Sequence, residues 1–540
     1  MLVWIWLGCL VAAVLLYFRQ VYSFFKRRGV KTPGIIPPFG TMLSVLVKRE
    51  HFAEQITRFY NQFPDQKFYG TFQFTKPFLQ VRDIELIKKI CIKEFESFLD
   101  HNTVISEDYD PLFGRNLFSL KGQEWKDMRS TLSPAFTSSK MKMMLPLMVE
   151  VGDQMNLCLQ KKIKESKHGY LDVDVKDLTT RYTNDVIASC AFGLKVDSHM
   201  KEGNQFYKMG KTVAYFKFRQ ILMFFLLSSF PKVAGVFKWT LFPKSVQNFF
   251  RALVVNTMKN RELEQIIRPD MIHLLMEAKK GKLTYDEKSS RDKDAGFATV
   301  EESFVGQKQI NRVWSDDDLC AQVILFFIAG FEGVSSAMTF LLYELSVNPD
   351  VQEKLYQEIR ENEAKNNGKF DYNSIQNMVY MDMVVSETLR LWTSGFATDR
   401  YCNKDYNLGK PNDEATEDYI MRKGESLQIP VCAIHRDPEY YPNPHKFDPE
   451  RFSEENKHKI QPFTYLPFGI GPRNCIGSRF ALCEVKVMAY QVVNCFEVFP
   501  SERTTIPPKL DPSTFNVHMK GGHWNRFKAR KEVQSRAHQG

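Results

Sequence analysis

One cysteine in a glycine-rich loop is the feature that most constrains this chain. The loop spans residues 468–477 and reads Phe-Gly-Ile-Gly-Pro-Arg-Asn-Cys-Ile-Gly, with Arg473 two residues before Cys475. A metal-ligating thiolate needs nearby positive charge and backbone N–H groups directed at its sulfur. The three glycines permit positive φ angles and the close approach of a flat ligand. The pattern predicts a metal-ligating cysteine, and the alternative is a structural turn around a buried free thiol.

The composition is typical of a large globular protein. The chain has 540 residues, of which 44% are hydrophobic and 25% are charged, and no linker-like stretch divides it after its first forty residues. We therefore expect one catalytic domain over residues 41–540. The net charge of +10 is spread along the chain, which favours an anionic membrane or an acidic protein as partner, and not nucleic acid.

The ten cysteines are scattered, and no Cys-x-x-Cys pair is present. This pattern excludes a typical zinc or dithiol redox motif. Reduced thiols in a protein that faces the cytosol are the expected state.

The N-terminus carries an uncharged apolar run from Leu2 to Phe18, followed by Arg19 and a basic cluster at residues 26–28. At about 1.5 Å per residue the run is about 25 Å long, enough for a thin bilayer. We predict a membrane anchor over residues 1–25 and a basic, Pro/Gly-rich hinge over residues 26–40, with the rest of the chain in the cytosol. The alternative is a cleaved signal peptide, but the run lacks a preceding basic region.

A long apolar helix is predicted from residue 316 to about Val347. Ser315 provides an N-cap hydroxyl, and three aspartates follow it at the positive end of the helix dipole. The middle of this helix contains Ala329-Gly330-Phe331-Glu332-Gly333. Each glycine costs up to about 1 kcal/mol relative to alanine, and a buried carboxylate costs more unless it is paired or hydrated. These residues therefore indicate a functional site.

Two further pairs occur at helical spacing. Glu387 and Arg390 lie in an apolar segment, where an unpaired charge would be costly, so they predict a buried ion pair. Trp125 and Arg129 lie one turn apart and can both donate to a carboxylate. Alone, each pair is most often a surface feature.

Together these motifs resemble those of the cytochromes P450, and most closely the insect microsomal enzymes of family 9. The resemblance runs from the N-terminal anchor to about residue 525, with the Trp/Arg pair, the glycine-containing helix, the Glu/Arg pair, Arg451 and the cysteine loop in the family's order. It implies a mainly α fold with small β-sheets, preceded by one transmembrane helix.

The resemblance also implies a haem b cofactor, with Cys475 as the axial ligand of the iron. In the family, Glu387, Arg390 and Arg451 would lock the core around the cysteine loop. The residues that correspond to cofactor-binding positions are Phe468, Gly469, Arg473, Cys475, Trp125, Arg129 and Arg400, with Arg115 as a further candidate.

The oxygen-activating positions implied by the resemblance are Ala329, Gly330, Glu332 and Gly333. The family usually has threonine at the last of these, where its hydroxyl helps to deliver protons. Gly333 therefore puts efficient coupling in doubt. A water, a substrate hydroxyl or Ser336 one turn later are the candidate replacements.

The implied activity is monooxygenation of hydrophobic small molecules with NADPH-derived electrons, in xenobiotic detoxification. The electrons would come from NADPH–cytochrome P450 reductase in the endoplasmic reticulum membrane, with cytochrome b5 as a second candidate partner. Basic residues proposed for the reductase face are Lys126, Lys140 and Lys486. Substrate-facing regions would be Val104–Phe118, Phe216–Phe230, Phe327 and Phe331, Phe396–Thr398 and Thr514–Val517.

Two other functions are compatible with the sequence. One is a haem-thiolate isomerase or dehydratase that acts on peroxides without a reductase, which Gly333 keeps open. The other is a haem-based ligand carrier without enzymatic activity. Turnover of a hydroperoxide without NADPH would identify the first, and a ligand-induced spectral shift without product would identify the second.

Overall fold

The computed structural model describes most of the chain. The described residues are 1–102, 107, 110–201, 203–214, 218–230, 233, 236, 243–268, 270–280, 296–306, 312–368 and 370–530. Parts of two substrate-facing regions, residues 104–106, 108–109 and 216–217, lie outside them, as does most of residues 231–242.

The described chain is mainly helical, with small sheets, as the sequence predicts. The α-helices are α1 Leu2–Tyr22, α2 Leu43–Leu46, α3 Phe52–Gln62, α4 Ile84–Lys88, α5 Pro111–Gly114, α6 Gly122–Leu132, α7 Ser138–Glu165, α8 Val175–Cys190, α9 Gln205–Ala214, α10 Phe218–Ser229, α12 Lys244–Glu264, α13 Met271–Lys279, α14 Asp316–Ile328, α15 Ser335–Val347, α16 Pro349–Lys365, α17 Tyr372–Gln376, α18 Val379–Leu391, α19 Val431–Ile434 and α20 Ser478–Cys495. Short 3₁₀ turns are η1 Lys26–Arg28, η3 Phe95–Ser97, η4 Ser133–Phe136, η8 Pro449–Phe452 and η9 Lys457–Lys459, and π-helical turns are η2 Lys89–Lys93 and η7 Ala329–Val334.

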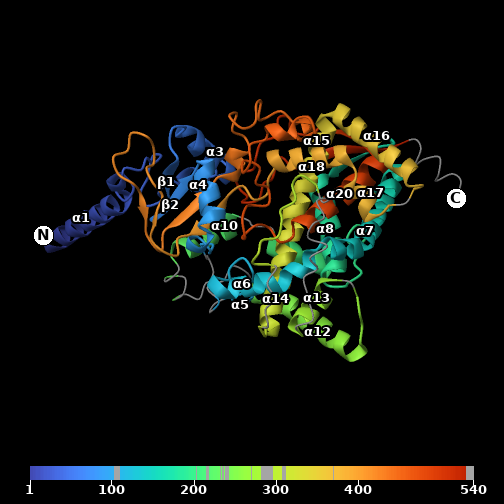
Figure 1. Ribbon diagram of the computed structural model, residues 1–540, viewed down its shortest axis with the longest axis horizontal. Helices are drawn as coiled ribbons and strands as arrows, with labels where there is room; N and C mark the ends of the chain where they lie inside the picture. Colours follow the sequence, from blue (N-terminus) through green and yellow to red (C-terminus); the bar gives the residue numbers. More distant parts are fainter. Residues whose placement is uncertain are drawn as a thin grey trace.

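The strands form three small sheets. Their bounds are β1 Phe68–Gln73, β2 Lys76–Val81, β3 Leu171–Asp174, β4 Thr398–Tyr401, β5 Tyr406–Asn407, β6 Ile420–Met421, β7 Ser426–Ile429, β8 Phe496–Pro500 and β9 Trp524–Ala529. The largest sheet has the order β1-β2-β7-β4, in which only β2 and β7 run parallel. It lies near α1 and α3, while α7, α8, α15, α18 and α20 gather on the opposite side of the molecule (Figure 1).

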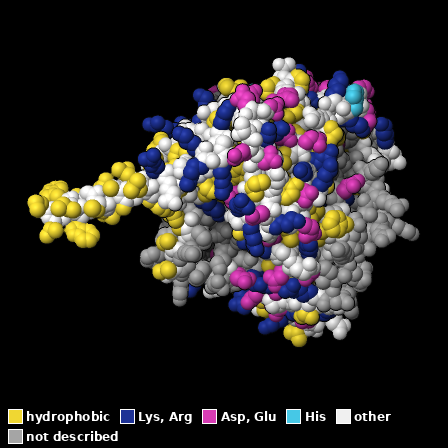
Figure 2. Space-filling view, turned by 60° about the vertical axis from the view of Figure 1, so that its left-hand side comes forward, with side chains coloured by type: hydrophobic (Ala, Val, Ile, Leu, Met, Phe, Trp, Pro, Cys, Tyr) yellow, Lys and Arg dark blue, Asp and Glu magenta, His cyan; other side chains and the backbone are white. Residues whose placement is uncertain are grey.

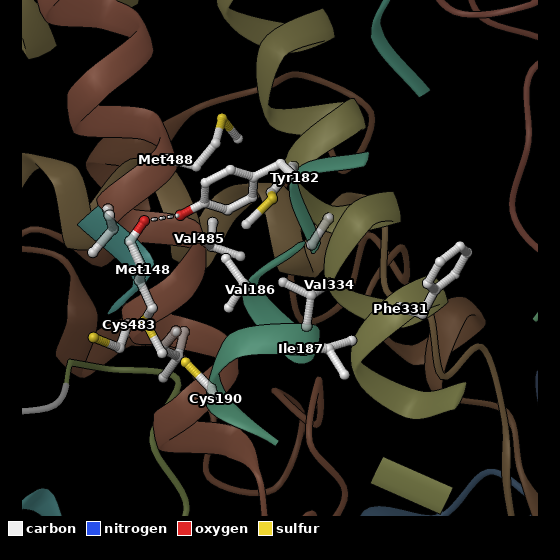
Figure 3. Packing of buried hydrophobic residues seen from close by; sticks show 14 of the residues in the cluster. Met148, Tyr182, Val186, Ile187, Cys190, Phe331, Val334, Cys483, Val485 and Met488 are labelled. Carbon is white, nitrogen blue, oxygen red and sulfur yellow. Dashed lines mark hydrogen bonds between the residues drawn. The ribbon is translucent and has the colours of Figure 1, made fainter. Parts of the chain in front are cut away.

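Two hydrophobic cores correspond to these two sides. The helical core contains residues of α7, α8, α14, α15, α18 and α20, and the other core joins α3, β1, β2 and β7 to the segments before and after the cysteine loop. In the helical core the buried Tyr182 hydroxyl donates to the Met148 carbonyl at 3.4 Å, beside Val186 and Met488 (Figure 3). Burying the aromatic ring therefore leaves its polar atom with a partner.

The long central helix begins where the sequence predicts. The Ser315 hydroxyl accepts from the Asp318 N–H at 3.1 Å, and the Asp318 carboxylate accepts from the Ser315 N–H at 3.0 Å. This reciprocal arrangement caps the N-terminus of α14. The helix does not continue as a regular α-helix, because η7 separates α14 from α15. A π-helical turn inserts an extra residue and often marks a functional site.

The predicted Glu/Arg pair is fully buried in α18. The Arg390 guanidinium donates to both Glu387 carboxylate oxygens, at 2.7 and 2.9 Å, and the Arg451 guanidinium lies 3.4 Å from the same carboxylate. The Arg390 guanidinium also donates to the His435 carbonyl at 2.7 Å. The expected ion pair is thus confirmed, and it joins α18 to two later segments of the chain.

The N-terminal helix α1 projects from the body as an isolated rod with apolar side chains on its surface, and Lys and Arg side chains gather where it meets the body (Figure 2). The stretch Leu2–Arg28 is long and apolar enough to span a membrane: an 18-residue window of it has a mean hydropathy of 2.1, and none of that window is buried. Asp316–Val347 also meets these criteria, but 61% of its window is buried in the core. Just after α1, Phe25 and Val30 are buried against the largest sheet.

Deletion of residues 2–20 tests the anchor without removing Phe25 or Val30 from the core. We expect most of the protein to leave the membrane while haem binding is retained, because no residue of α1 is buried and the contacts of Tyr22 with the core are kept. Flotation with vesicles measures the first property and the haem absorption band the second. Full membrane binding by the shortened chain would contradict the assignment, and a mature N-terminus beyond Phe18 would show that the run is a cleaved signal.

Arg390→Met tests the buried pair. Without Arg390 the Glu387 carboxylate remains buried with a poorer partner, so we expect a loss of about 3–5 kcal/mol in the free energy of unfolding. The matched control is Arg422→Met, because Arg422 forms an exposed pair with Asp405 and its loss should cost about 0–1 kcal/mol. Urea unfolding of both variants measures the difference, and equal midpoints would contradict the structural role of the pair.

Candidate functional site

A cavity of about 440 Å³ lies between the cysteine loop, η7 and α6. This volume is within the range of small-molecule and cofactor sites. Nine of the predicted site residues line it together, although they come from three distant parts of the sequence: Trp125, Arg129, Ala329, Gly330, Gly333, Phe468, Gly469, Arg473 and Cys475. Among the described residues, Glu332 and Arg400 are absent from its wall.

The Cys475 thiol is accessible from this cavity and lies just before the N-terminus of α20. Burial within the protein raises its pKa, while the Gly477 N–H that it accepts from and the nearby Arg129 charge oppose that rise. The positive end of the α20 dipole also favours a negative sulfur. The site therefore provides the groups that a thiolate ligand needs.

The conformation of the loop depends on two glycines. Gly469 and Gly471 have φ values of +74° and +73°. A Cβ atom on Gly471 would overlap the Cys91 carbonyl, so no larger residue fits there. Gly477 differs from the expectation: its φ is −92°, and it forms the N-cap of α20.

Arg129 joins α6 to the cysteine loop. Its guanidinium donates to the Asn474 carbonyl at 2.7 Å and to the Asn474 side-chain oxygen at 2.8 Å. It also forms a buried ion pair with Glu302 at 2.8 Å. Arg129 is thus fixed beside the residue that precedes Cys475.

Arg473 is buried and directed toward the segment before α6. It donates to the carbonyls of Leu99 and Leu120 at 2.8 and 2.9 Å, and its guanidinium lies 3.3 Å from Asp100. The guanidinium also stacks 4.0 Å from the Trp125 ring, a cation–π contact. These contacts hold the loop and the Trp125 ring in one arrangement at the cavity wall.

Arg400 and Arg115 lie behind the cavity wall. Arg400 donates to the Ile470 carbonyl in the cysteine loop at 3.2 Å, and its buried Nε makes no hydrogen bond within the described structure. Arg115 is paired with Asp318 of α14 and with Glu107. Arg115 therefore stabilises the start of α14.

The π-helical turn η7 has two different faces. Ala329, Gly330 and Gly333 line the cavity of Cys475, whereas Phe331 and Glu332 line a second cavity of about 620 Å³. Figure 3 shows Val334 and Phe331 on opposite sides of this helix. No described atom lies within 4 Å of the position that a Cβ on Gly333 would take. The turn thus presents small residues to one cavity and a charged residue to the other.

Glu332 is the centre of a buried charged cluster. Its Oε1 lies 3.0 Å from the Lys176 ammonium and 3.0 Å from His518 Nε2, and it accepts from the Ser336 hydroxyl at 3.1 Å. Burial opposes its ionisation, but Lys176 and His518 outweigh that effect and lower the pKa of Glu332 to about 2. Glu332 is therefore an ionised carboxylate with three partners.

Several residues at this site were not predicted from the sequence. Lys176, Glu302 and His518 pair with predicted site residues from far away in the sequence. His101 lines the cavity and pairs with Asp399 at 2.9 Å. A lone histidine or lysine carries no local pattern, so only the expectation that a buried charge needs a partner would have suggested a search for them.

Two proposed surface or substrate roles do not agree with the structure. Lys486 is completely buried and pairs with Asp382 at 2.9 Å, so its assignment to a basic surface is wrong. Phe327 is also completely buried, in an aromatic cluster with Phe206 and Phe250, and among the described residues it does not line the Cys475 cavity. Both residues face the core because helix geometry turns them away from the cavity.

Comparison with known proteins identifies the family. A sequence model described as Cytochrome P450 matches residues 30–526. The chain belongs to the cytochrome P450 family. It is 44% identical to cytochrome P450 9e2 of Blattella germanica over 96% of this chain and 97% of that protein. It is 40% identical to probable cytochrome P450 9f2 of Drosophila melanogaster, over 97% and 99% of the two chains, and 38% identical to cytochrome P450 9b2 of the same species, over 98% and 100%.

These matches confirm the resemblance inferred from the motifs, including the likeness to insect family 9. As a cytochrome P450, the chain is a reductase-dependent monooxygenase, and the family implies a haem cofactor and a small-molecule substrate. The cavity residues fit a haem. Of the two cysteines that line the cavity, Cys475 is exposed and Cys190 is buried; apolar side chains such as Phe326 and Val334 also line it, and the cations Arg129 and Arg473 flank it. A haem has the matching groups: a metal, two flat apolar faces and two carboxylates.

Proposed function

We propose that this chain inserts one atom of dioxygen into lipophilic small molecules, with electrons from NADPH delivered by NADPH–cytochrome P450 reductase. The proposed location is the endoplasmic reticulum membrane, with the catalytic domain in the cytosol and cytochrome b5 as a second redox partner. Detoxification of xenobiotics is the proposed role. The observation that carries the proposal is the Cys475 thiol, which faces a 440 Å³ cavity between an apolar helix and a cationic wall.

In this proposal Cys475 is the axial ligand of haem b. Phe468 and Gly469 would form the surface of the loop against the haem. Trp125 would donate to its carboxylates, and Arg129 and Arg473 would balance their charge, with Arg400 as a further cation that binds the loop from behind the cavity wall. When bound, a haem with a thiolate ligand supplies the oxygen activation that monooxygenation requires. Burial raises the pKa of the Cys475 thiol, and the Gly477 N–H and the Arg129 charge oppose that rise, so both would favour the thiolate that the iron would bind.

The residues of η7 would have two roles: the small ones leave room for small molecules, and Glu332 takes part in proton transfer. Ala329, Gly330 and Gly333 leave room in the cavity for small molecules, since they carry no large side chain. Glu332 is ionised, lies 3.0 Å from His518 and lines the second cavity, so it can orient water there for proton transfer. We propose that Glu332 passes protons across the turn, and that water takes the place of a hydroxyl at Gly333.

Cys475→Ala tests the ligand assignment. The variant should lose the absorption band characteristic of a reduced, carbon monoxide-bound haem thiolate, because Cys190, the other cysteine that lines the cavity, is buried on α8 and burial raises its pKa. The matched control is Cys483→Ala, since Cys483 is a buried core cysteine on α20, and this variant should keep the band. A normal band in Cys475→Ala would refute the assignment.

Gly333→Thr tests the proton pathway. A missing hydrogen bond of about 1–3 kcal/mol corresponds to about a ten- to hundredfold change in how protonation competes with peroxide release. The Thr variant should therefore form more product and less hydrogen peroxide per NADPH consumed, and the open space at Gly333 admits the added Cβ.

The companion variant Glu332→Gln keeps the size of the side chain and removes its charge, so it should lower product per NADPH. Unchanged coupling in Gly333→Thr would mean that water already performs the role of the hydroxyl. If Glu332→Gln were also silent, the proton pathway through η7 would be wrong. Rapid hydroperoxide turnover without NADPH would favour the isomerase instead, and a spectral shift with no product would favour a carrier.

A further inference from the structure

The wall of the Cys475 cavity contains one histidine among its described residues, His101. Its Nδ1 lies 2.9 Å from one oxygen of the Asp399 carboxylate. The other oxygen of Asp399 accepts from the Asn102 N–H at 2.6 Å. The His101 ring also stacks on Phe118, with the ring centres 4.5 Å apart and an angle of 19° between the planes. Asp399 and Phe118 therefore fix the orientation of the imidazole, and the Asn102 N–H holds the Asp399 carboxylate in place.

Asp399 also determines which nitrogen carries the proton in the neutral ring. A carboxylate only accepts, so Nδ1–H donates to it and Nε2 is left as an acceptor. Within the described part of the chain, Nε2 makes no hydrogen bond. A second donor on His101 appears only when Nε2 takes up a proton.

The charges around His101 keep it neutral when the cavity holds no anion. Burial lowers its pKa, Arg473 and Arg400 lower it further, and Asp399 opposes them. The remaining charged neighbours are engaged elsewhere: Asp100 lies 3.3 Å from Arg473, and the Lys76 ammonium donates to Asn102 at 2.7 Å. An anion in the cavity would change this balance, because it favours the protonated ring.

We propose that His101 and Asp399 form a proton-binding pair, which holds a carboxylate of the bound cofactor and takes up one proton as that carboxylate binds. The proposal rests on the haem-binding function proposed above, since haem supplies the carboxylates. In the protonated ring, Nδ1–H donates to Asp399 and Nε2–H donates to the cofactor. Asp399 acts as a positioning residue, and the fixed guanidinium of Arg473 lies beside the pair.

The consequence is a haem affinity that depends on pH. Bound haem raises the pKa of His101 above its value in the empty cavity, so binding takes up a proton between the two pKa values. The contribution of this pair to the haem affinity is greatest below the pKa of His101 in the empty cavity. It falls by up to about tenfold per pH unit between that pKa and the pKa of His101 with haem bound, and the affinity is constant at higher pH.

Haem transfer from the purified holoprotein to excess apomyoglobin measures this effect over about pH 5.5–8.5. The ratio of the release rate of His101→Gln to that of the wild type isolates the pair from other pH effects on haem release. We expect the ratio to be largest at low pH and to decrease through the titration of His101. His101→Arg keeps a cation that does not titrate, so it should release haem slowly with no such step.

Asp399→Asn should move the step to lower pH, because the bound imidazolium loses its anionic partner. His168→Gln, at an exposed histidine, is the control and should match the wild type. A pH-independent ratio for His101→Gln, or a wild-type step that persists in His101→Arg, would overturn the proposal. The carbon monoxide band distinguishes this proposal from the proposed function. Its presence in all these variants supports ligation of the haem by Cys475, whether or not His101 binds a carboxylate. Its absence from the wild type would contradict the proposed function itself.

Discussion

Keeping a sulfur ionised inside an apolar cavity is the constraint on which this structure depends. Burial alone favours the neutral thiol, and the fold opposes this with the N-terminus of α20, the Gly477 N–H and the Arg129 charge. Each of these must lie within a few ångströms of Cys475, although Arg129 comes from a helix more than 300 residues earlier. The loop, α6 and α20 therefore have to be fixed relative to one another.

The buried ion pair of α18 provides part of that rigidity. Arg390 donates to the His435 carbonyl, and His435 Nδ1 lies 3.1 Å from the Arg390 carbonyl. His435 Nε2 then accepts from the Leu466 N–H at 2.7 Å, at the entry to the cysteine loop. Burial and the Arg390 charge lower the pKa of His435 to about 3, so the ring stays neutral and Nε2 remains an acceptor. A continuous set of hydrogen bonds thus connects Glu387 to the loop.

The π-helical turn separates two kinds of chemistry within one helix. An extra residue in the turn rotates the following side chains, so Gly333 faces the Cys475 cavity while Glu332 faces Lys176 and His518. A carboxylate on the apolar side of the Cys475 cavity, beside Phe326 and Val334, would be destabilised, whereas in the second cavity Glu332 is paired with Lys176. Small residues on one side and charge on the other therefore follow from the energetics of burial.

The cationic part of the cavity wall was predicted only in part from local motifs. Trp125, Arg129 and Arg473 were expected from the sequence to meet a common ligand, and they do line one cavity. In the structure Arg129 is paired with Glu302 and Arg473 with Asp100. These acids reduce the net positive charge that faces the cavity, which makes the titratable His101 a significant addition to it.

The sequence by itself determined the features that depend on short-range patterns. Spacing of three or four residues was enough for the Glu387–Arg390 pair and the capped start of α14, because neighbouring turns of one helix bring those groups together. The length of an uncharged apolar run was enough for the anchor helix. The glycine-rich context was enough to single out Cys475. The family resemblance added the mainly helical fold, which periodicity alone did not provide.

Only the tertiary structure decided which groups meet across the chain. Lys176 and His518 reach Glu332 from 156 and 186 residues away, and Asp399 reaches His101 from 298 residues away. The same is true of orientation: Phe327 and Lys486 point into the core, and Gly477 caps a helix without a positive φ. Such outcomes depend on packing and on the need of each buried charge for a partner, and neither is encoded in the spacing of nearby residues.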